Sequence, residues 1–275
     1  MKKHILGLAA TVALAAMAAV PASAHRQWMM PSSTVLSGDD VWVTVDAAVS
    51  NDLFYFEHQP LRLDSTKAWA PDGTEVAIEN KSTGRYRSTF DVHLTQKGTY
   101  RIASVADMLM GTYDLNGKTE RLPRGTTAEN LAEKLPAGAT NVKTAEANNR
   151  NEIFVTVGEP TTTLFKPTGK GIELVPVTHP NDLFAGEAAT FQFLLDGKPA
   201  VGLPVTVIPG GIRYRDQLGQ IDLKTDADGK VEVTWPEPGM YWLNVTTPQA
   251  GGGEGAPQPI ARRASYVTTL EVLAP

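Results

Sequence analysis

Four histidines follow the first 24 residues of the chain, and they are the side chains best suited to bind a transition metal: His25, His58, His93 and His179. Imidazole nitrogen suits copper, nickel and zinc, whereas thiolate sites are excluded because the sequence contains no cysteine. No H-x-H, H-x-x-x-H or HExxH spacing occurs. Metal ligands in a β-protein usually come from different strands, so these histidines are candidates for a site that only folding can assemble.

His25 is the first candidate, because a signal-peptide cleavage site stands directly before it. Two basic residues, Lys2 and Lys3, precede a short apolar run that ends in the A-x-A site Ala22-Ser23-Ala24. We therefore predict that residues 1–24 are removed and that His25 becomes the amino terminus. An amino-terminal histidine can chelate a divalent metal through its α-amino and imidazole nitrogens. The alternative is that His25 follows the cut by chance.

His58 and His93 are the next metal candidates. His58 follows Glu57, which offers a carboxylate oxygen, although a loop edge packed by the neighbouring aromatic residues is a simpler account. His93 lies on the polar side of a predicted strand, residues 89–94, and an ordinary solvent-facing histidine explains it as well. His179 stands in a turn before a proline, and turn geometry accounts for its neighbours.

The leader and the composition predict a periplasmic or secreted protein. The apolar run is shorter than the roughly 20 residues that cross a membrane, and no later stretch is long enough. Because the cysteine of a lipoprotein anchor is also absent, we expect no membrane anchor after cleavage. Without Lys2 and Lys3 the 30 acidic residues exceed the basic ones by seven, and no basic run could follow a phosphate backbone. Nucleic acid is therefore not expected as a partner.

The common catalytic patterns are missing from the sequence. It has no G-x-S-x-G nucleophile motif and no glycine-rich phosphate loop. A carboxylate pair for glycoside hydrolysis would be assembled only by folding, and nothing in the sequence supports one. We therefore expect a binding protein and not an enzyme.

Short segments rich in β-branched and aromatic residues predict an all-β protein. Turn pairs such as Asp72-Gly73 and Asp228-Gly229 separate these segments, which is the pattern of β-sandwiches. One stretch departs from it: Thr126 to Leu135 begins with a hydroxyl residue and places its apolar residues on one helical face. We predict a short helix there.

The same order of turn and strand signals occurs twice, which predicts two sandwiches. Lys97-Gly98-Thr99-Tyr100 corresponds to Pro238-Gly239-Met240-Tyr241, and Tyr100 and Tyr241 resemble the tyrosine that stabilises a corner of such folds. A stretch rich in Pro, Gly and Thr between the two suits a linker. We expect immunoglobulin-like or transthyretin-like domains in tandem, with the helix in the first and these boundaries: first domain 25–158, linker 159–171, second domain 172–275.

Several motifs occur in order over almost the whole chain after the leader: Ala24-His25, Trp28 and Pro31, then Gly171 to Pro176, Pro180 to Leu183, Phe191 to Pro199 and Thr225 to Gly229. Together they resemble a periplasmic domain-of-unknown-function family that is labelled a cobalt- or nickel-transport periplasmic component (NikM-like). The resemblance implies a secreted all-β protein that handles a divalent transition metal beside a membrane transporter. It favours His25, which matches the N-terminal motif, over His179, whose position varies in the family pattern.

These observations predict a periplasmic protein that binds nickel, cobalt or copper at His25, with His58 and His93 as further ligands, and that delivers or buffers the metal. One alternative is an interaction module without metal that contacts an outer-membrane receptor or another periplasmic protein. Another is a copper-dependent polysaccharide oxygenase, because such enzymes use an amino-terminal histidine and a second histidine on a β-sandwich. The separation of His25 from His58 and His93 in the fold distinguishes the metal site from the interaction module.

Overall fold

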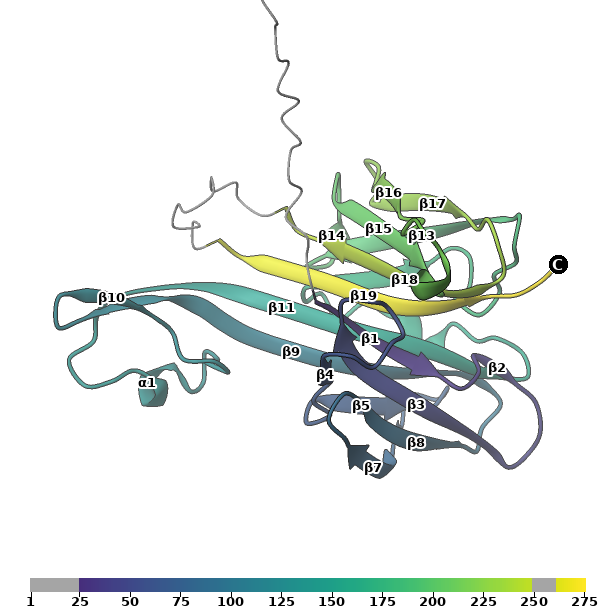
Figure 1. The fold of residues 1–275 in the computed structure, drawn as a ribbon, viewed down its shortest axis with the longest axis horizontal. Coiled ribbons are helices and arrows are strands. Elements are labelled where there is room, and N and C mark those ends of the chain that lie inside the picture. The colour runs from purple at the N-terminus through teal and green to yellow at the C-terminus, as the bar shows by residue number, and fades with distance from the viewer. Residues whose placement is uncertain (1–24, 249–260) are drawn as a thin grey trace, which may run out of the picture.

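The computed structural model describes residues 25–248 and 261–275, and the predicted signal peptide lies outside these residues. The described chain is all-β and forms two sandwiches in tandem, as the alternation of short strands and turns predicts (Figure 1). We refer to residues 25–157 as the N-terminal half and to the described residues from 158 onward as the C-terminal half.

The N-terminal half contains a five-stranded sheet in the order β1-β3-β8-β7, with β4 paired to β3. Its longest strands, β9 and β11, form a hairpin that extends well beyond the sandwich (Figure 1). The elements of this half are β1 (Arg26–Pro31), β2 (Val35–Leu36), β3 (Val41–Ser50), β4 (Gln59–Pro60), β5 (Thr66–Trp69), β6 (Glu75–Val76), β7 (Glu79–Thr83), β8 (Ser88–Leu94), β9 (Gly98–Leu115), β10 (Lys118–Arg121), α1 (Leu131–Lys134) and β11 (Thr140–Val157).

The C-terminal half contains a four-stranded sheet in the order β12-β13-β14, with β17 paired to β13. Two short 3-10 helices, η1 and η2, lie in its loops. The elements of this half are η1 (Thr163–Phe165), β12 (Ile172–Pro176), β13 (Ala188–Leu195), β14 (Lys198–Pro199), β15 (Pro204–Pro209), η2 (Ile212–Tyr214), β16 (Ile221–Lys224), β17 (Lys230–Thr234), β18 (Gly239–Thr246) and β19 (Arg263–Val272).

A ten-stranded sheet belongs to both halves, in the order β16-β15-β18-β19-β11-β9-β5-β6, with β10 paired to β9 and β2 to β11. The halves meet where β11 and β19 pair in parallel, with Ala147 opposite Arg263 and Glu152 opposite Thr268. The sequence does not predict this shared sheet, because the two paired strands are more than 100 residues apart. Each half therefore completes its sandwich with strands of one common sheet.

Strand β11 is covered on both faces, which explains why every residue from 151 to 157 is buried. Ile153 and Val155 belong to the core between the five-stranded sheet and β5, β9 and β11. Phe154 points to the opposite face and joins the core of the C-terminal half. A third apolar cluster, which contains Trp28 and Trp242, packs β1 against the shared sheet. The two halves are thus joined by apolar packing as well as by backbone hydrogen bonds.

Both predicted corner tyrosines make the expected backbone contact. The Tyr100 hydroxyl accepts a hydrogen bond from the Gln96 amide at 2.6 Å, and the Tyr241 hydroxyl donates one to the Glu237 carbonyl at 2.7 Å. Each bond spans four residues and closes the turn before a long strand, β9 or β18. These tyrosines therefore have a structural role, as the sequence indicates.

The helix near the end of the β9–β11 hairpin is shorter than predicted: only Leu131–Lys134 is helical, not Thr126 to Leu135. The Asn130 side chain accepts a hydrogen bond from the Thr127 amide, and the Thr127 hydroxyl accepts one from the Asn130 amide. Such side-chain bonds satisfy the backbone in a turn and compete with a helical conformation. The helix therefore begins only after Asn130.

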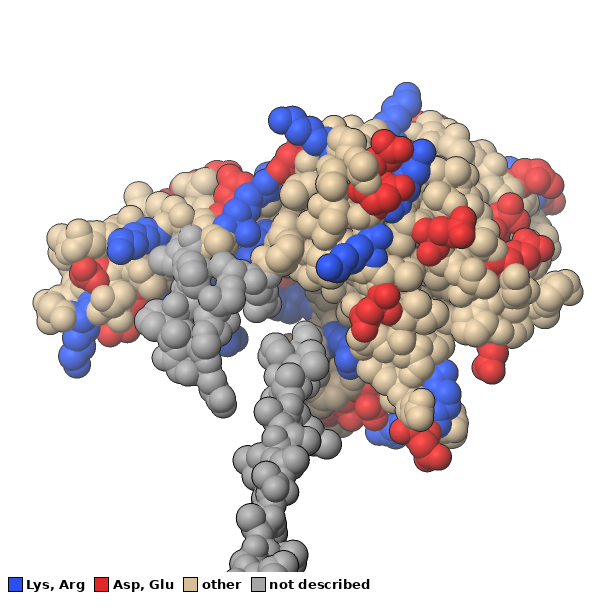
Figure 2. Space-filling model, turned by 90° about the horizontal axis from the view of Figure 1, so that it is seen from above, with Lys and Arg blue, Asp and Glu red and all other residues tan. Residues whose placement is uncertain are grey.

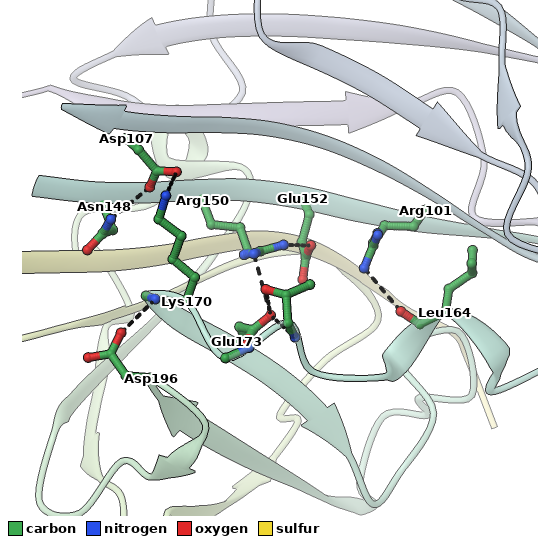
Figure 3. Close-up of polar contacts among 12 residues, drawn as sticks. Arg101, Asp107, Asn148, Arg150, Glu152, Leu164, Lys170, Glu173 and Asp196 are labelled. Carbon is green, nitrogen blue, oxygen red and sulfur yellow. Dashed lines mark hydrogen bonds and ion pairs between the residues drawn. The ribbon is translucent and has the colours of Figure 1, made fainter. Parts of the chain in front are cut away.

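A buried network of charged residues lies at the junction between the halves (Figure 3). The Arg150 guanidinium of β11 lies 3.4 Å from the Glu152 carboxylate and 3.5 Å from the Glu173 carboxylate of β12. Glu173 also accepts hydrogen bonds from the Thr168 hydroxyl and amide and from the Gly169 amide. Burial alone would raise the pKa of the Glu173 carboxyl, but these bonds and Arg150 outweigh it and lower the pKa.

Because the folded state holds Glu173 with a lowered pKa, the stabilisation it supplies is present above the unfolded pKa of about 4.3 and is lost as the pH falls toward the folded pKa. We expect Glu173→Gln to lower the free energy of unfolding at pH 7 by about 1.5–3 kcal/mol, since hydrogen bonds to a charged group are lost. The variant should also lose stability less steeply with acidification. Urea unfolding between pH 3 and 7 measures both effects.

Glu75→Gln is the matched control, because Glu75 forms an exposed ion pair with Lys67 that contributes little to stability. An unchanged pH dependence in Glu173→Gln would show that this carboxylate does not couple protonation to the junction.

Candidate functional site

Two of the predicted metal ligands, His25 and His58, meet at the end of β3. In the sheet, Arg26 of β1 pairs with Ser50 of β3, and Gln59 of β4 pairs with Val49 of β3. His25 therefore stands just before β1 and His58 just before β4, on opposite sides of the same strand end. Two strand spacings separate their backbones by roughly 9–10 Å, a distance that two imidazole side chains can close.

The rings of His25 and His58 are stacked, with their centroids 3.9 Å apart and their planes inclined by 7°. Both residues are exposed. In a parallel stack the in-plane nitrogen lone pairs point side by side and do not converge. Joint ligation of a metal therefore requires a change of side-chain torsion angles, and the exposure of both residues leaves room for it.

The metal site would depend on the amino terminus for its third donor. Among the described residues, no three His, Cys, Asp or Glu side chains converge in a way that could hold a metal ion. Cleavage before His25 would add the α-amino nitrogen to the two imidazoles. The resulting set consists of three nitrogens, which suits copper and nickel.

The loop of residues 51–58 positions His58. The Glu57 carboxylate accepts hydrogen bonds from the amides of Asn51 and Asp52, at 2.8 and 2.9 Å. At the start of the loop, the Ser50 hydroxyl accepts a hydrogen bond from the Trp28 indole and donates one to the Asp52 carbonyl. Glu57, which the sequence offers as an oxygen ligand next to His58, thus orders the backbone of the loop.

The backbone next to His25 is tied down on both sides. The Arg26 guanidinium donates a hydrogen bond to the Asn51 carbonyl at 2.9 Å, which links β1 to the His58 loop. The Trp242 indole of β18 donates one to the Gln27 carbonyl at 2.9 Å. Strand β1 therefore presents His25 from a fixed position although the residue itself is exposed.

The third predicted ligand, His93, does not reach this site. It pairs with Trp42, eight residues before the end of β3, which places it roughly 26 Å along the strand from His25 and His58. Its imidazole stacks on the Trp42 ring at 4.2 Å, and its Nε2 lies 2.7 Å from the Asp40 carboxylate. His93 therefore fits the solvent-facing alternative. Its position on the polar face of β8 is a local pattern, which does not determine the distance to His25.

His179 lies at the contact between the halves and has a structural environment. Its Nδ1 accepts a hydrogen bond from the Asn181 amide, so the neutral ring carries its proton on Nε2, which lies 3.2 Å from the Thr161 carbonyl. The Phe165 ring packs edge-on against it. Burial lowers the pKa of His179, although Thr161 and Asp182 oppose the shift.

We expect His179→Ala to lower the free energy of unfolding at neutral pH by about 1–3 kcal/mol, because the Asn181 amide and Thr161 carbonyl lose their partner. With its folded pKa below the unfolded value of about 6.5, His179 destabilises the fold as the pH falls below that value. The variant should lack this part of the acid sensitivity. Thermal unfolding from pH 8 to 5 tests both points.

The partly exposed His93, changed to Ala, is the control and should cost less than about 1 kcal/mol. Equal effects of the two substitutions would contradict the structural role of His179.

Charges of both signs are mixed on one face of the molecule. On the face shown in Figure 2, outside the part that grey atoms cover, Lys and Arg are interspersed with Asp and Glu. Within the described residues, no helix has the length and apolar character needed to span a membrane.

Residues 22–249 match the model of a family described as a domain of unknown function (DUF4198). No curated protein matches the chain. The match covers most of both sandwiches and includes His25 and His58. It does not carry the cobalt or nickel transport label that the resemblance of the motifs implies.

Some solved structures match most of this chain at low identity and with low TM-scores. An alpha-2-macroglobulin from Salmonella, reacted with methylamine, is 12% identical over 92% of this chain, with a TM-score of 0.23. The D0-D1 domain of intimin is 11% identical over 89% of this chain and 97% of its own length, with a TM-score of 0.22. A DUF4785 family protein from Legionella pneumophila is 7% identical over 81% of this chain and 52% of its own length, with a TM-score of 0.26.

The chain spans only 15% of the macroglobulin that it matches. With TM-scores this low, none of the three similarities supports a function for the chain.

Proposed function

The chain belongs to the DUF4198 family, and we propose that it is a periplasmic protein that binds nickel, cobalt or copper through the amino terminus of His25 and the imidazole of His58. The observation that carries the proposal is the contact between these two rings, 3.9 Å apart, across the end of β3. The histidines are 33 positions apart in the sequence, and only the pairing of β1 and β4 with the same strand brings them together.

The donor set supports a transition metal over a hard cation. Calcium and magnesium prefer oxygen ligands, whereas two imidazoles and an amine offer nitrogen only. Glu57, the carboxylate next to His58 in the sequence, already accepts hydrogen bonds from two backbone amides. His25 contributes its second nitrogen only once residues 1–24 have been removed, so the site would form after export.

The choice of metal depends on both affinity and supply. Copper is the tightest binder to a nitrogen site in the Irving–Williams order, whatever ion the protein meets in the cell. The resemblance to cobalt and nickel transport components favours those ions as cargo. We propose that the protein delivers or buffers the metal for a membrane transporter and does not catalyse a reaction.

The two alternatives differ in what they require at the end of β3. An interaction module without metal needs no second histidine near His25, so the contact with His58 favours metal binding. A copper-dependent polysaccharide oxygenase would use the same pair beside a flat aromatic face. The nearby rings of Tyr55 and Tyr214 are inclined by 62° to each other, so these two do not form one plane.

A competition titration with copper, nickel and cobalt tests the proposal, using protein whose amino terminus has been verified as His25. We expect that one alanine added before His25 abolishes tight binding, because the amino nitrogen then becomes an amide. His58→Ala should weaken copper binding by at least about tenfold, since one of the three nitrogens is lost. Isothermal calorimetry against a competing chelator measures both affinities.

His93→Ala is the matched control, because this histidine lies in the same sandwich but far from the site. The copper affinity of this variant should equal that of the unmodified protein. Binding that survives both the extension and His58→Ala would remove this site from the function and leave the interaction module as the better account.

A further inference from the structure

The loop that carries His58 is in direct contact with the C-terminal half. Residues 210–214, which precede and include η2, lie against it at three points that involve Phe54, Tyr55 and Asp52. All three contacts join the loop to residues of the C-terminal half. They join residues that are about 160 positions apart, so the sequence contains no local signal for them.

The first contact is apolar and very close. Phe54 adopts a positive φ of 64°, a conformation that bulky side chains rarely adopt and that the surroundings must hold. Its ring packs edge-on against Trp28 at 5.4 Å and lies against Gly210. A Cβ on Gly210 would lie 3.1 Å from the Phe54 ring, so the C-terminal half approaches the loop with its bare backbone.

The second and third contacts come from one side chain. The Arg213 guanidinium lies 4.4 Å from the centre of the Tyr55 ring, a cation–π geometry, and its Nε is 3.6 Å from the Asp52 carboxylate. Tyr214 adds an edge-on ring contact to Tyr55 at 6.4 Å. Arg213 therefore holds the loop at two residues that flank Phe54.

The backbone next to His25 is also held by the C-terminal half. The Trp242 indole of β18 donates its hydrogen bond to the Gln27 carbonyl, two residues after His25, and the Arg26 guanidinium lies 5.9 Å from the Trp242 ring. Both histidines thus stand on backbone that the C-terminal half supports, although both belong to the N-terminal sandwich.

We infer that Arg213 is a positioning residue for the His25–His58 site, so that the C-terminal half sets the metal affinity of a site to which it contributes no ligand. This inference rests on the proposed function. Partners that orient metal ligands commonly affect affinity by 10- to 100-fold. Arg213 acts one step further away, through the loop, and we expect an effect at the lower end of that range.

The test compares Arg213→Ala with Arg85→Ala, using the mature full chain and copper(II) as the probe. Arg85 is the matched control because its guanidinium also lies over a tyrosine ring, that of Tyr86 at 5.5 Å, in the turn between β7 and β8. We expect Arg213→Ala to lower copper affinity about tenfold and to change the copper electron paramagnetic resonance spectrum. Arg85→Ala should change neither.

Two further measurements separate positioning from general destabilisation. Amide hydrogen exchange of residues 51–58 in the metal-free protein should accelerate in Arg213→Ala, while the thermal midpoint stays close to that of Arg85→Ala. Arg213→Lys keeps the charge near Asp52 but lacks the planar group over Tyr55, so it should restore part of the affinity.

The outcomes distinguish this inference from the proposed function. If Arg213→Ala binds copper like the unmodified protein while His58→Ala loses it, the positioning role is wrong and the metal site stands. Faster exchange with unchanged affinity also overturns the positioning role. If His58→Ala keeps full affinity as well, the proposed function fails and this inference fails with it.

Discussion

The structure depends on the burial of β11 on both faces. Its residues 151–157 fill the N-terminal core on one side with Ile153 and Val155 and the C-terminal core on the other with Phe154. If β11 were an edge strand, its backbone donors and acceptors on that side would be unpaired. The parallel pairing with β19 satisfies these groups. The two sandwiches therefore share one continuous sheet and are not independent domains joined only by a linker.

This shared sheet has a polar counterpart at the junction. Arg150, Glu152 and Glu173 are removed from water together, and each charge is compensated by another charge or by backbone amides. Burying charges is costly unless they are paired and hydrogen-bonded, and breaking such a pair leaves an uncompensated charge. The network therefore disfavours displacement of β12 relative to β11.

The candidate metal site lies where the N-terminal half contacts β18 and η2 of the C-terminal half. His25 and His58 are exposed and belong to the N-terminal sandwich, but the backbone beneath them is fixed by Glu57, Trp242 and Arg213. Exposed side chains on an ordered backbone can reorient without remodelling the fold, as the proposed metal binding would require. If Arg213 has the positioning role that we infer, metal affinity would depend on the docking of the two halves, because Arg213 and Trp242 come from the C-terminal half.

The sequence by itself determined the all-β class and the corner tyrosines, and it made His25 the first metal candidate, because alternation, turn residues and a predicted cleavage site are local patterns. It also named His58 as the first histidine to join His25, but it kept His93 as a further candidate, since nothing local excludes a polar-face histidine. Only the tertiary structure decided which histidines meet, because strand register and not sequence distance sets proximity in a sheet. The shared sheet and the Arg213 contact were equally beyond the sequence, as both join segments more than 100 residues apart through packing.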